Sequence, residues 1–272
     1  MEIPFTKLHG NGNDFIGIDE YEKTVIPDDM KTQFATLYCD RRFGIGADGV
    51  LFLSKSDTGN LRMRILQPDG SEAEMCGNGI RCLVKYAFDT GYVKESCTVE
   101  TLAGAMPVTM QYRDDEFYAK ITMGIPVFER KGIPATGEGE YKETIGLHEV
   151  YAANTGVPHA VVFVDNLDSI DVASQSPQIR FHETFPKGAN VNFVQVTGPD
   201  AISIRTFERG VEAETLSCGT GATASAAVAH KLGKVGTTVH VETTGGPLTI
   251  TLDGVARMEG PAATVFTGVI TF

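Results

Sequence analysis

The two halves of the chain resemble each other, and this repeat constrains the fold more than any other feature of the sequence. Residues 76–79 read Cys-Gly-Asn-Gly and residues 218–221 read Cys-Gly-Thr-Gly. The two copies lie 142 positions apart (218 minus 76), which is close to half of the 272 residues. A period this long, present in two copies, predicts duplicated domains and excludes a solenoid of short repeats.

The similarity continues upstream of both motifs. Residues 63–67 read Met-Arg-Ile-Leu-Gln and parallel residues 204–208, Ile-Arg-Thr-Phe-Glu. The other matched segments are residues 72–74 with 212–214, 46–48 with 188–190, and 13–15 with 157–159. We therefore expect a first domain over residues 1–121 that carries Cys76 and a second over 122–264 that carries Cys218. The final strand, 265–272, is expected to return to the first domain.

Hydrophobic patterning predicts the same elements in both halves. After Cys76, apolar residues at positions 80, 83, 84, 87 and 88 have helical spacing, and Gly91 is a suitable stop. After Cys218, the small residues of 222–229 suit a helix enclosed by a sheet, with Gly233 at its end. Segment 132–146 is expected to be a surface loop. Short apolar or alternating runs predict strands at residues 16–18, 50–53, 98–101, 160–164 and 202–204.

Composition excludes several classes of function. Hydrophobic residues make up 42% and charged residues 21% of the chain, as in soluble globular proteins. A net charge of −12 argues against nucleic acid and anionic membranes as partners, because both require a basic surface. The sequence contains no apolar run long enough to span a membrane and no signal peptide. The odd number of cysteines, five, is typical of reduced thiols in a cytoplasmic protein.

Two of the five cysteines are candidates for chemistry. Cys39, Cys82 and Cys97 are expected to be small buried hydrophobic residues, with Cys82 inside the first predicted helix. Cys76 and Cys218 differ, since each precedes a glycine-rich turn into a predicted helix and the repeat relates them. The free N–H groups and partial positive charge of a helix start lower a thiol's pKa and also bind carboxylates.

This arrangement suits inversion at a carbon atom. If the two domains pack face to face about a pseudo-twofold axis, both helix starts meet, and one sulfur lies on each side of an amino acid's α-carbon. One thiolate removes the α-proton, and the opposite thiol delivers a proton to the other face. The helix-end N–H groups stabilise the charge that builds up on the α-carboxylate. The sequence therefore predicts a cofactor-independent amino-acid epimerase.

At these residues the chain resembles the diaminopimelate epimerase family over essentially its whole length. The shared motifs are residues 7–15 (KLHGNGNDF), 44–49 (GIGADG), 69–72 (DGSE), 75–82 (MCGNGIRC), 158–159 (PH), 208–210 (ERG) and 218–221 (CGTG). The resemblance implies an α/β (α+β) fold, with two pseudo-twofold-related domains, each a rolled, mostly antiparallel sheet around a central helix. It also implies a cytoplasmic, homodimeric isomerase that interconverts LL- and meso-diaminopimelate in lysine and peptidoglycan precursor synthesis, without pyridoxal phosphate or metal.

The resemblance also implies roles for individual residues. Cys76 and Cys218 match the acid–base pair, with Cys218 the base toward the LL isomer and Cys76 the proton donor. Glu208 matches a ligand of the α-ammonium, and Arg209 matches the anchor of the distal carboxylate. His159 and Glu208 match residues that modulate the pKa values of the thiols. The remaining substrate-binding positions are Asn13, Gln67, Gly77, Asn78, Asn190, Gly219 and Thr220.

Two positions depart from the family pattern. Val157 stands where many members have an asparagine that helps to hold the distal end of the substrate, and Asn154 is close to it in sequence. Gln67 stands where many members have asparagine. Both departures concern the distal carboxylate and leave the reacting centre intact. An alternative is therefore a two-cysteine racemase or epimerase of the same superfamily that acts on another amino acid.

Other classes of function fit less well. Proline-racemase-type enzymes also use paired cysteines, but they typically have histidine at the position of Asn78, and Glu208-Arg209 argues against that type. A thiol redox protein would contain Cys-x-x-Cys, and a metal site would need paired histidines or closely spaced cysteines. The Gly-x-Gly of residues 44–46 lacks the strand–turn–helix context of a dinucleotide site.

Overall fold

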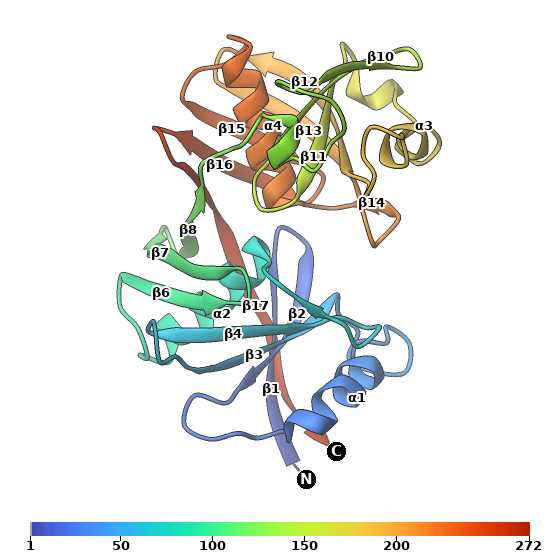
Figure 1. Cartoon of the computed structure of the whole chain (residues 1–272). Helices are drawn as coiled ribbons and strands as arrows, with labels where there is room; N and C mark the ends of the chain where they lie inside the picture. Colours follow the sequence, from blue (N-terminus) through green and yellow to red (C-terminus); the bar gives the residue numbers. More distant parts are fainter. Residues whose placement is uncertain (1) are drawn as a thin grey trace. The chain divides into compact units, whose positions relative to one another are not determined.

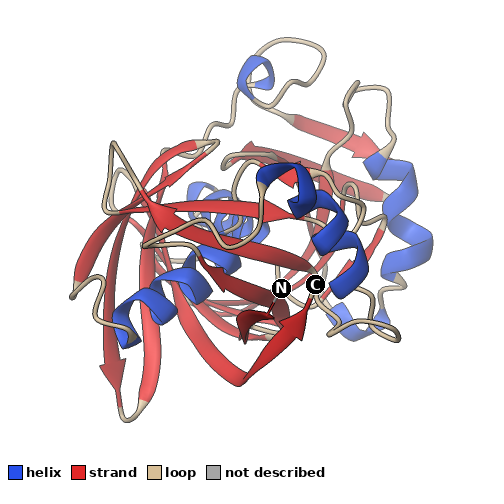
Figure 2. Cartoon of the chain, turned by 90° about the horizontal axis from the view of Figure 1, so that it is seen from below, coloured by secondary structure: helices blue, strands red, loops and turns tan. Residues whose placement is uncertain are grey.

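The computed structural model describes residues 2–272, which form four α-helices, two short 3-10 helices and 17 strands (Figure 1). The strand-rich character is visible when helices and strands are coloured separately (Figure 2). The chain divides into two compact units: residues up to 121 together with 260–272, and residues 122–259. No helix in the described part of the chain is long and apolar enough to cross a membrane.

Unit 1 is a sheet with one helix buried against it. Helix α2 (Gly77–Asp89) contacts the first four strands, and most of its residues are buried. Helix α1 (Asp28–Tyr38) contacts β4. The pairs β2–β3 and β4–β6 are parallel, and the neighbours β1–β2, β3–β4, β6–β7 and β7–β8 are antiparallel. The strands are β1 (Glu2–Gly10), β2 (Asn13–Asp19), β3 (Gly49–Lys55), β4 (Leu61–Leu66), β5 (Glu72–Ala73), β6 (Ser96–Thr101), β7 (Gly104–Arg113) and β8 (Glu116–Gly124).

Unit 2 repeats this plan. Helix α4 (Gly219–Lys231) is buried against strands β10–β13, β15 and β16, and α3 (Val172–Arg180) packs on β12 and β13. The short helices are η1 (Arg130–Gly132) and η2 (Leu167–Ser169). The strands are β9 (Lys142–Ile145), β10 (His148–Asn154), β11 (Pro158–Phe163), β12 (Asn190–Gly198), β13 (Ala201–Glu208), β14 (Ala213–Thr215), β15 (Thr238–Thr243), β16 (Gly246–Leu252) and β17 (Ala256–Thr271), whose second part belongs to unit 1.

Strand pairing in the two units follows one pattern. The parallel pair β11–β12 corresponds to β2–β3, and the parallel pair β13–β15 corresponds to β4–β6. In each unit the central helix follows the short strand β5 or β14 and precedes β6 or β15. The expected fold of mostly antiparallel sheets around a central helix is therefore confirmed.

Local sequence explains why both central helices start and stop where predicted. Cys76 and Cys218 are the N-cap residues, with extended backbone, and glycines follow both. Gly91 and Gly233, just beyond the helix ends, have φ of +80° and +69°, a conformation that glycine adopts without strain. In α4 the small residues allow the surrounding strands to approach closely, and residues 221–229 are all buried.

Among the elements that the sequence did not predict, three show the limits of local patterns. Strand β9 lies inside segment 132–146, so the prediction of a continuous surface loop was wrong; β9 pairs with β10 across a tight turn at Gly146, where φ is +59°. Helix α1 begins after Pro27 without a side-chain cap. Helix α3 contains Pro177 and few apolar residues, which weakens its helical pattern.

Candidate active site

The first candidate half-site lies at the start of α2. The backbone N–H of Gly79 donates to Sγ of Cys76 at 3.4 Å, so the thiol caps the helix. On its other side the Cys76 thiol donates to Oδ1 of Asn13 at 3.5 Å. Asn78 donates its side-chain amide to the same oxygen at 3.2 Å. Cys76 is partly exposed, and the predicted residues Asn13, Gly77 and Asn78 surround it.

The orientation of the Asn13 amide is set by Asp48. Nδ2 of Asn13 donates to Oδ2 of Asp48 at 2.6 Å, and the other oxygen of Asp48 accepts from Arg41 at 2.7 Å. A carboxylate only accepts, so the amide nitrogen of Asn13 must face Asp48 and its oxygen must face Cys76. Arg41 also pairs with Asp14. Burial opposes ionisation of Asp14, but hydrogen bonds from Arg41 and Lys7 outweigh burial and lower the pKa of Asp14 to about 2.

The second candidate half-site lies at the start of α4. Cys218 is buried, and its Sγ lies 3.4 Å from Oγ1 of Thr220. Burial, and then the negative charge of Glu208, raise the pKa of the Cys218 thiol well above its ordinary value, although hydrogen bonds from Thr220 and Gly221 act in the opposite direction. The expectation that the helix start lowers this pKa was therefore wrong for the free protein, because desolvation outweighs the helix.

A chain of hydrogen-bonded side chains, of which His159 and Asn192 are buried, leads through Thr220 to Cys218. Nε2 of His159 lies 2.8 Å from the hydroxyl of Thr220, and Nδ1 of His159 lies 3.0 Å from the amide nitrogen of Asn192. Complete burial, and then the charge of Arg209, lower the pKa of His159 to about 3. The imidazole is thus neutral near pH 7, and it reaches the thiol through Thr220.

The predicted ligands of the substrate lie near this half-site on β12, β13 and the turn that follows. The amide oxygen of Asn190 accepts from the backbone N–H of Arg209 at 2.8 Å, and its amide nitrogen donates to the carbonyl of Pro158 at 3.1 Å. Asn190 therefore positions the backbone of Arg209. Glu208 accepts a hydrogen bond from Thr215 at 3.0 Å and raises the pKa of Cys218.

Asn154, which is close in sequence to the departing residue Val157, and Gln67, the second departing residue, both have local partners. Asn154 donates to the carbonyl of Gly132 at 2.8 Å and accepts from the N–H of Gly156 at 2.9 Å. These bonds fix its amide on the backbone of unit 2, so Asn154 does not replace an asparagine at Val157. Gln67, just after β4, accepts from the hydroxyl of Ser71 at 2.8 Å.

The other three thiols are buried and inert. Burial raises the pKa of both Cys39 and Cys97 to about 12, and it raises the pKa of Cys82 as well. All five cysteines are free thiols in the described structure. The three were expected to be buried hydrophobic residues, and this expectation is confirmed.

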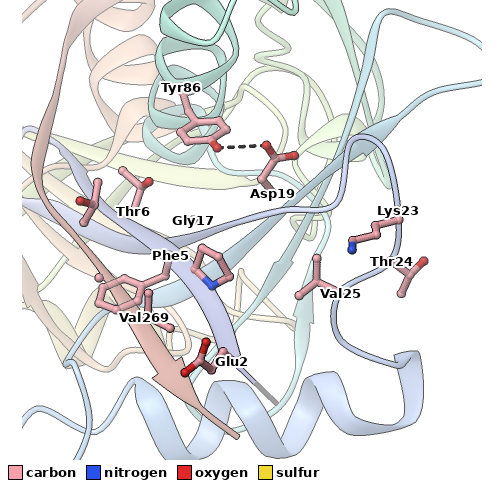
Figure 3. A pocket seen from close by; sticks show the side chains of 13 residues that line it. Glu2, Phe5, Thr6, Gly17, Asp19, Lys23, Thr24, Val25, Tyr86 and Val269 are labelled. Atoms are coloured by element: carbon pink, nitrogen blue, oxygen red, sulfur yellow. Dashed lines mark hydrogen bonds between the residues drawn. The ribbon is translucent and has the colours of Figure 1, made fainter.

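A hollow on unit 1 is not part of the candidate site. It has a volume of about 880 Å³ and is lined by parts of β1, β2, β17 and the loop after β2 (Figure 3). On one wall the hydroxyl of Tyr86 donates to Asp19 at 3.0 Å. None of the predicted site residues lines it. The candidate site is therefore defined by its chemistry and not by the size of a cavity.

Asn192 and Asp48 are the site residues whose roles the sequence did not predict. Asn192 lies two positions after Asn190 on β12, so both side chains project from the same face of the strand. The spacing of two residues from Asn190 along a strand is the signal that could have identified Asn192. For Asp48, the parallel between residues 46–48 and 188–190 pointed to the position. It did not identify Asn13 as the partner, because the hydrogen bond joins residues that are far apart in sequence.

Solved structures define the class to which this fold belongs. The fold matches a member of the phenazine biosynthesis protein PhzF family from Bacillus anthracis with a TM-score of 0.75 at 18% identity, covering all of both chains. It also matches a hydroxyproline epimerase from Agrobacterium vitis with a TM-score of 0.68 at 20% identity, covering 99% of this chain and 92% of that one. The chain thus has the fold that these proteins share.

Sequence comparison identifies the family within that class. The sequence model of diaminopimelate epimerase matches residues 5–129 and 151–265. A diaminopimelate epimerase of Methanothrix thermoacetophila is 57% identical, covering 99% of this chain and 96% of that protein. Those of Methanocella arvoryzae and Archaeoglobus fulgidus are 54% and 49% identical, each over 99% of this chain and 97% of the relative. The chain belongs to the diaminopimelate epimerase family.

Proposed function

We propose that Cys76 and Cys218 are the acid–base pair with which this isomerase interconverts LL- and meso-diaminopimelate. The observation that carries the proposal is that the two thiols are the N-cap residues of equivalent helices in two units of equivalent topology. As a member of the diaminopimelate epimerase family, the protein epimerises diaminopimelate, a reaction of lysine biosynthesis. We also propose, from the family resemblance, that its meso product feeds peptidoglycan precursor synthesis.

Each turnover moves one proton off the α-carbon and one proton onto it. The thiolate on one face forms an S–H bond as the C–H bond breaks, and the thiol on the other face loses its proton to the carbanion. The two sulfurs exchange charge states, so the enzyme that releases one isomer is in the protonation state that converts that same isomer back. Protons must exchange with solvent before the next turnover in the same direction. The mechanism requires both half-sites to face one substrate in the working enzyme.

Glu208 connects the binding of the substrate to the charge on Cys218. In the free protein, burial and the Glu208 carboxylate hold Cys218 as a thiol by raising its pKa. An α-ammonium group paired with Glu208 neutralises the carboxylate charge, which removes one cause of that rise. As the substrate binds, Cys218 releases its proton to solvent, and the resulting thiolate removes the α-proton of the LL isomer, with Cys76 as the donor.

The starts of α2 and α4 supply the remaining groups. Backbone N–H groups at Gly77, Asn78, Gly219 and Thr220 are suited to the α-carboxylate, whose charge grows as the carbanion forms. Arg209 pairs with the distal carboxylate, where a planar guanidinium can make two hydrogen bonds. Asn13, Gln67 and Asn190 complete the binding of the polar ends.

Sequence composition and the family point to the setting of the enzyme. We expect it to act in the cytoplasm as a homodimer, with a small-molecule substrate and no nucleic acid, membrane, cofactor or metal requirement. The runner-up function is inversion of another amino acid by the same pair of thiols, because Val157 and Gln67 alter the distal side. Gel filtration with light scattering tests the dimer.

The decisive experiment follows α-proton exchange in D2O. Wild-type enzyme without added cofactor should invert diaminopimelate and place deuterium at the α-carbon, and both Cys76→Ala and Cys218→Ala should abolish inversion. Cys97→Ala is the matched control and should keep most activity, since its thiol is buried on β6. Near-normal inversion by Cys76→Ala would refute the two-thiol mechanism. Faster inversion of lysine, glutamate or proline would overturn the substrate and leave the mechanism intact.

A further inference from the structure

Asn192, on β12, has a side-chain amide whose orientation is fixed by its partners. The residue is fully buried. Its Nδ2 donates to the carbonyl of Ala160 at 3.0 Å, and its Oδ1 accepts from the hydroxyl of Thr206 at 2.9 Å. A backbone carbonyl only accepts, so the amide nitrogen must be the atom on the Ala160 side. The second hydrogen of that nitrogen is directed at Nδ1 of His159, 3.0 Å away.

This contact determines which nitrogen of His159 carries the proton. Nδ1 faces an N–H donor and must therefore be the unprotonated, accepting nitrogen. The ring is neutral, since burial and Arg209 lower the pKa of His159 to about 3. Nε2 lies 2.8 Å from Oγ1 of Thr220, and the amide nitrogen of Asn190 is 3.5 Å from Nε2, at the outer limit of a hydrogen bond. The shorter 3.0 Å contact of Asn192 with Nδ1 decides the tautomer, so the proton is on Nε2 and is donated to Thr220.

The tautomer of His159 in turn directs the hydroxyl proton of Thr220. Because Oγ1 accepts from His159, the Thr220 hydroxyl donates elsewhere, and Sγ of Cys218 is 3.4 Å away. A donor aimed at sulfur stabilises the thiolate relative to the thiol. With the opposite tautomer, Nε2 would accept and would draw the same hydroxyl proton away from Cys218.

We propose that Asn192 is a positioning residue for catalysis: by fixing the Nε2–H tautomer of His159 it directs the Thr220 hydroxyl at Cys218. The inference rests on the proposed role of Cys218 as a proton carrier. The fit around Asn192 supports it, because a Cβ atom at Gly221 would lie 2.4 Å from Oδ1 of Asn192. The first turn of α4 can therefore approach this strand only with glycine at position 221.

The test is Asn192→Asp, which keeps the shape and removes the donor. A carboxylate facing Nδ1 requires a proton on that nitrogen, so Nε2–H is no longer the neutral form. In protein labelled with ¹⁵N-histidine, the His159 signals of the wild type should show the neutral Nε2–H form at pH 7. The signals of the variant should show a protonated Nδ1. The kcat should fall by about tenfold to a hundredfold, with KM changed less, as expected for loss of a hydrogen bond to a charged group.

Three further variants separate positioning from mere structural support. Thr220→Val removes the hydroxyl, so adding Asn192→Asp to it should lower kcat by less than about twofold. Thr220→Ser keeps the hydroxyl and should retain most of kcat. Thr206→Val is the matched control, since it removes a bond to Oδ1 of Asn192 but leaves Nδ2 held by Ala160; it should keep the Nε2–H tautomer.

Two results would overturn the inference. One is a wild-type spectrum with Nδ1 protonated, which needs no variant to fold. The other is an equal loss of kcat from Asn192→Asp with and without Thr220→Val. Neither result affects the two-thiol function, which depends on the inactivity of the cysteine variants.

Discussion

His159 illustrates how burial determines the chemistry of a single residue. Histidine ordinarily titrates near neutral pH, yet this ring has no exposed surface, and both of its nitrogens are in hydrogen-bond contact inside the protein. Burial removes the water that would stabilise an imidazolium, and no carboxylate takes its place among the causes of the shift. His159 therefore serves as an oriented neutral ring and not as a proton acceptor.

This environment predicts how stability depends on pH. The folded-state pKa of His159 is lowered to about 3 from 6.5, so between these values the unfolded chain binds a proton that the native protein does not. The contribution of His159 to the free energy of unfolding is complete above pH 6.5. It declines as the pH falls toward 3, by up to about 1.4 kcal/mol per pH unit. Urea unfolding of wild type and His159→Gln at pH 7.5, 6 and 5 should give slopes that differ by about one proton.

The diagnostic quantity is the slope of unfolding free energy against pH, because replacing a buried ring lowers the unfolding free energy itself at every pH. A variant with the same dependence of unfolding free energy on pH as the wild type would show that His159 is protonated in the native state. His240→Gln serves as the control, since His240 lies on an exposed position of β15. It should leave the slope close to that of the wild type.

At the scale of elements, strand ends and helix starts place the polar groups around each thiol. In unit 1 the first residue of β2 contacts Cys76 at the start of α2, and the residue before β3 orients that contact. The link is made by Asn13 and Asp48, and Arg41 holds the far oxygen of Asp48. The hydrogen bonds of Asn13 with Asp48 and with Cys76 connect the carboxylate to the thiol.

Asp48→Ala should therefore lower kcat/KM by about tenfold, the loss expected when one hydrogen bond to a charged group is removed. In an Asn13→Ala background the same change should cost less than about twofold, since the amide that Asp48 orients is gone. Steady-state kinetics on the four proteins measure this coupling. Glu22→Ala, which breaks an exposed ion pair with Lys55, is the control and should leave kcat/KM unchanged. Equal losses in both backgrounds would contradict the role of Asp48.

The elements that the sequence predicted are those with strong local signals. The helices after Cys76 and Cys218 have glycines at both ends, and α2 has a clear apolar stripe, so their limits could be placed to within a few residues. Helix α3 has a proline inside and is held by contacts with β12 and β13, which no local pattern reveals. The chain of contacts from Asn192 to Cys218 was equally hidden, since it joins β11, β12 and α4.

At the scale of the whole molecule, duplication explains how one fold supplies two cysteine-capped helices. Each unit repeats the same strand pairing and ends its short strand β5 or β14 just before a cysteine-capped helix. The copies then differ in the surroundings of the thiol. Cys76 is partly exposed next to Asn13, whereas Cys218 is buried beside Glu208 and Thr220. Equivalent positions thus carry thiols with different surroundings, and burial together with Glu208 raises the pKa of Cys218.

The proposed mechanism makes a prediction about the molecule as a whole, because two thiols that serve one α-carbon must be able to approach each other. When no substrate separates them, a mild oxidant such as diamide should join Cys76 to Cys218, taking two electrons and two protons from the pair. Oxidation should abolish activity, and dithiothreitol should restore it.

A peptide map under non-reducing conditions should contain the linked peptides, and Cys76→Ser should prevent both the link and the reversible part of the inactivation. Cys39 and Cys97 are internal controls, since both are buried and neither belongs to the two half-sites. Inactive oxidised protein in which Cys76 and Cys218 are not linked would mean that the two half-sites do not meet, and the two-thiol mechanism would then lose its geometric basis.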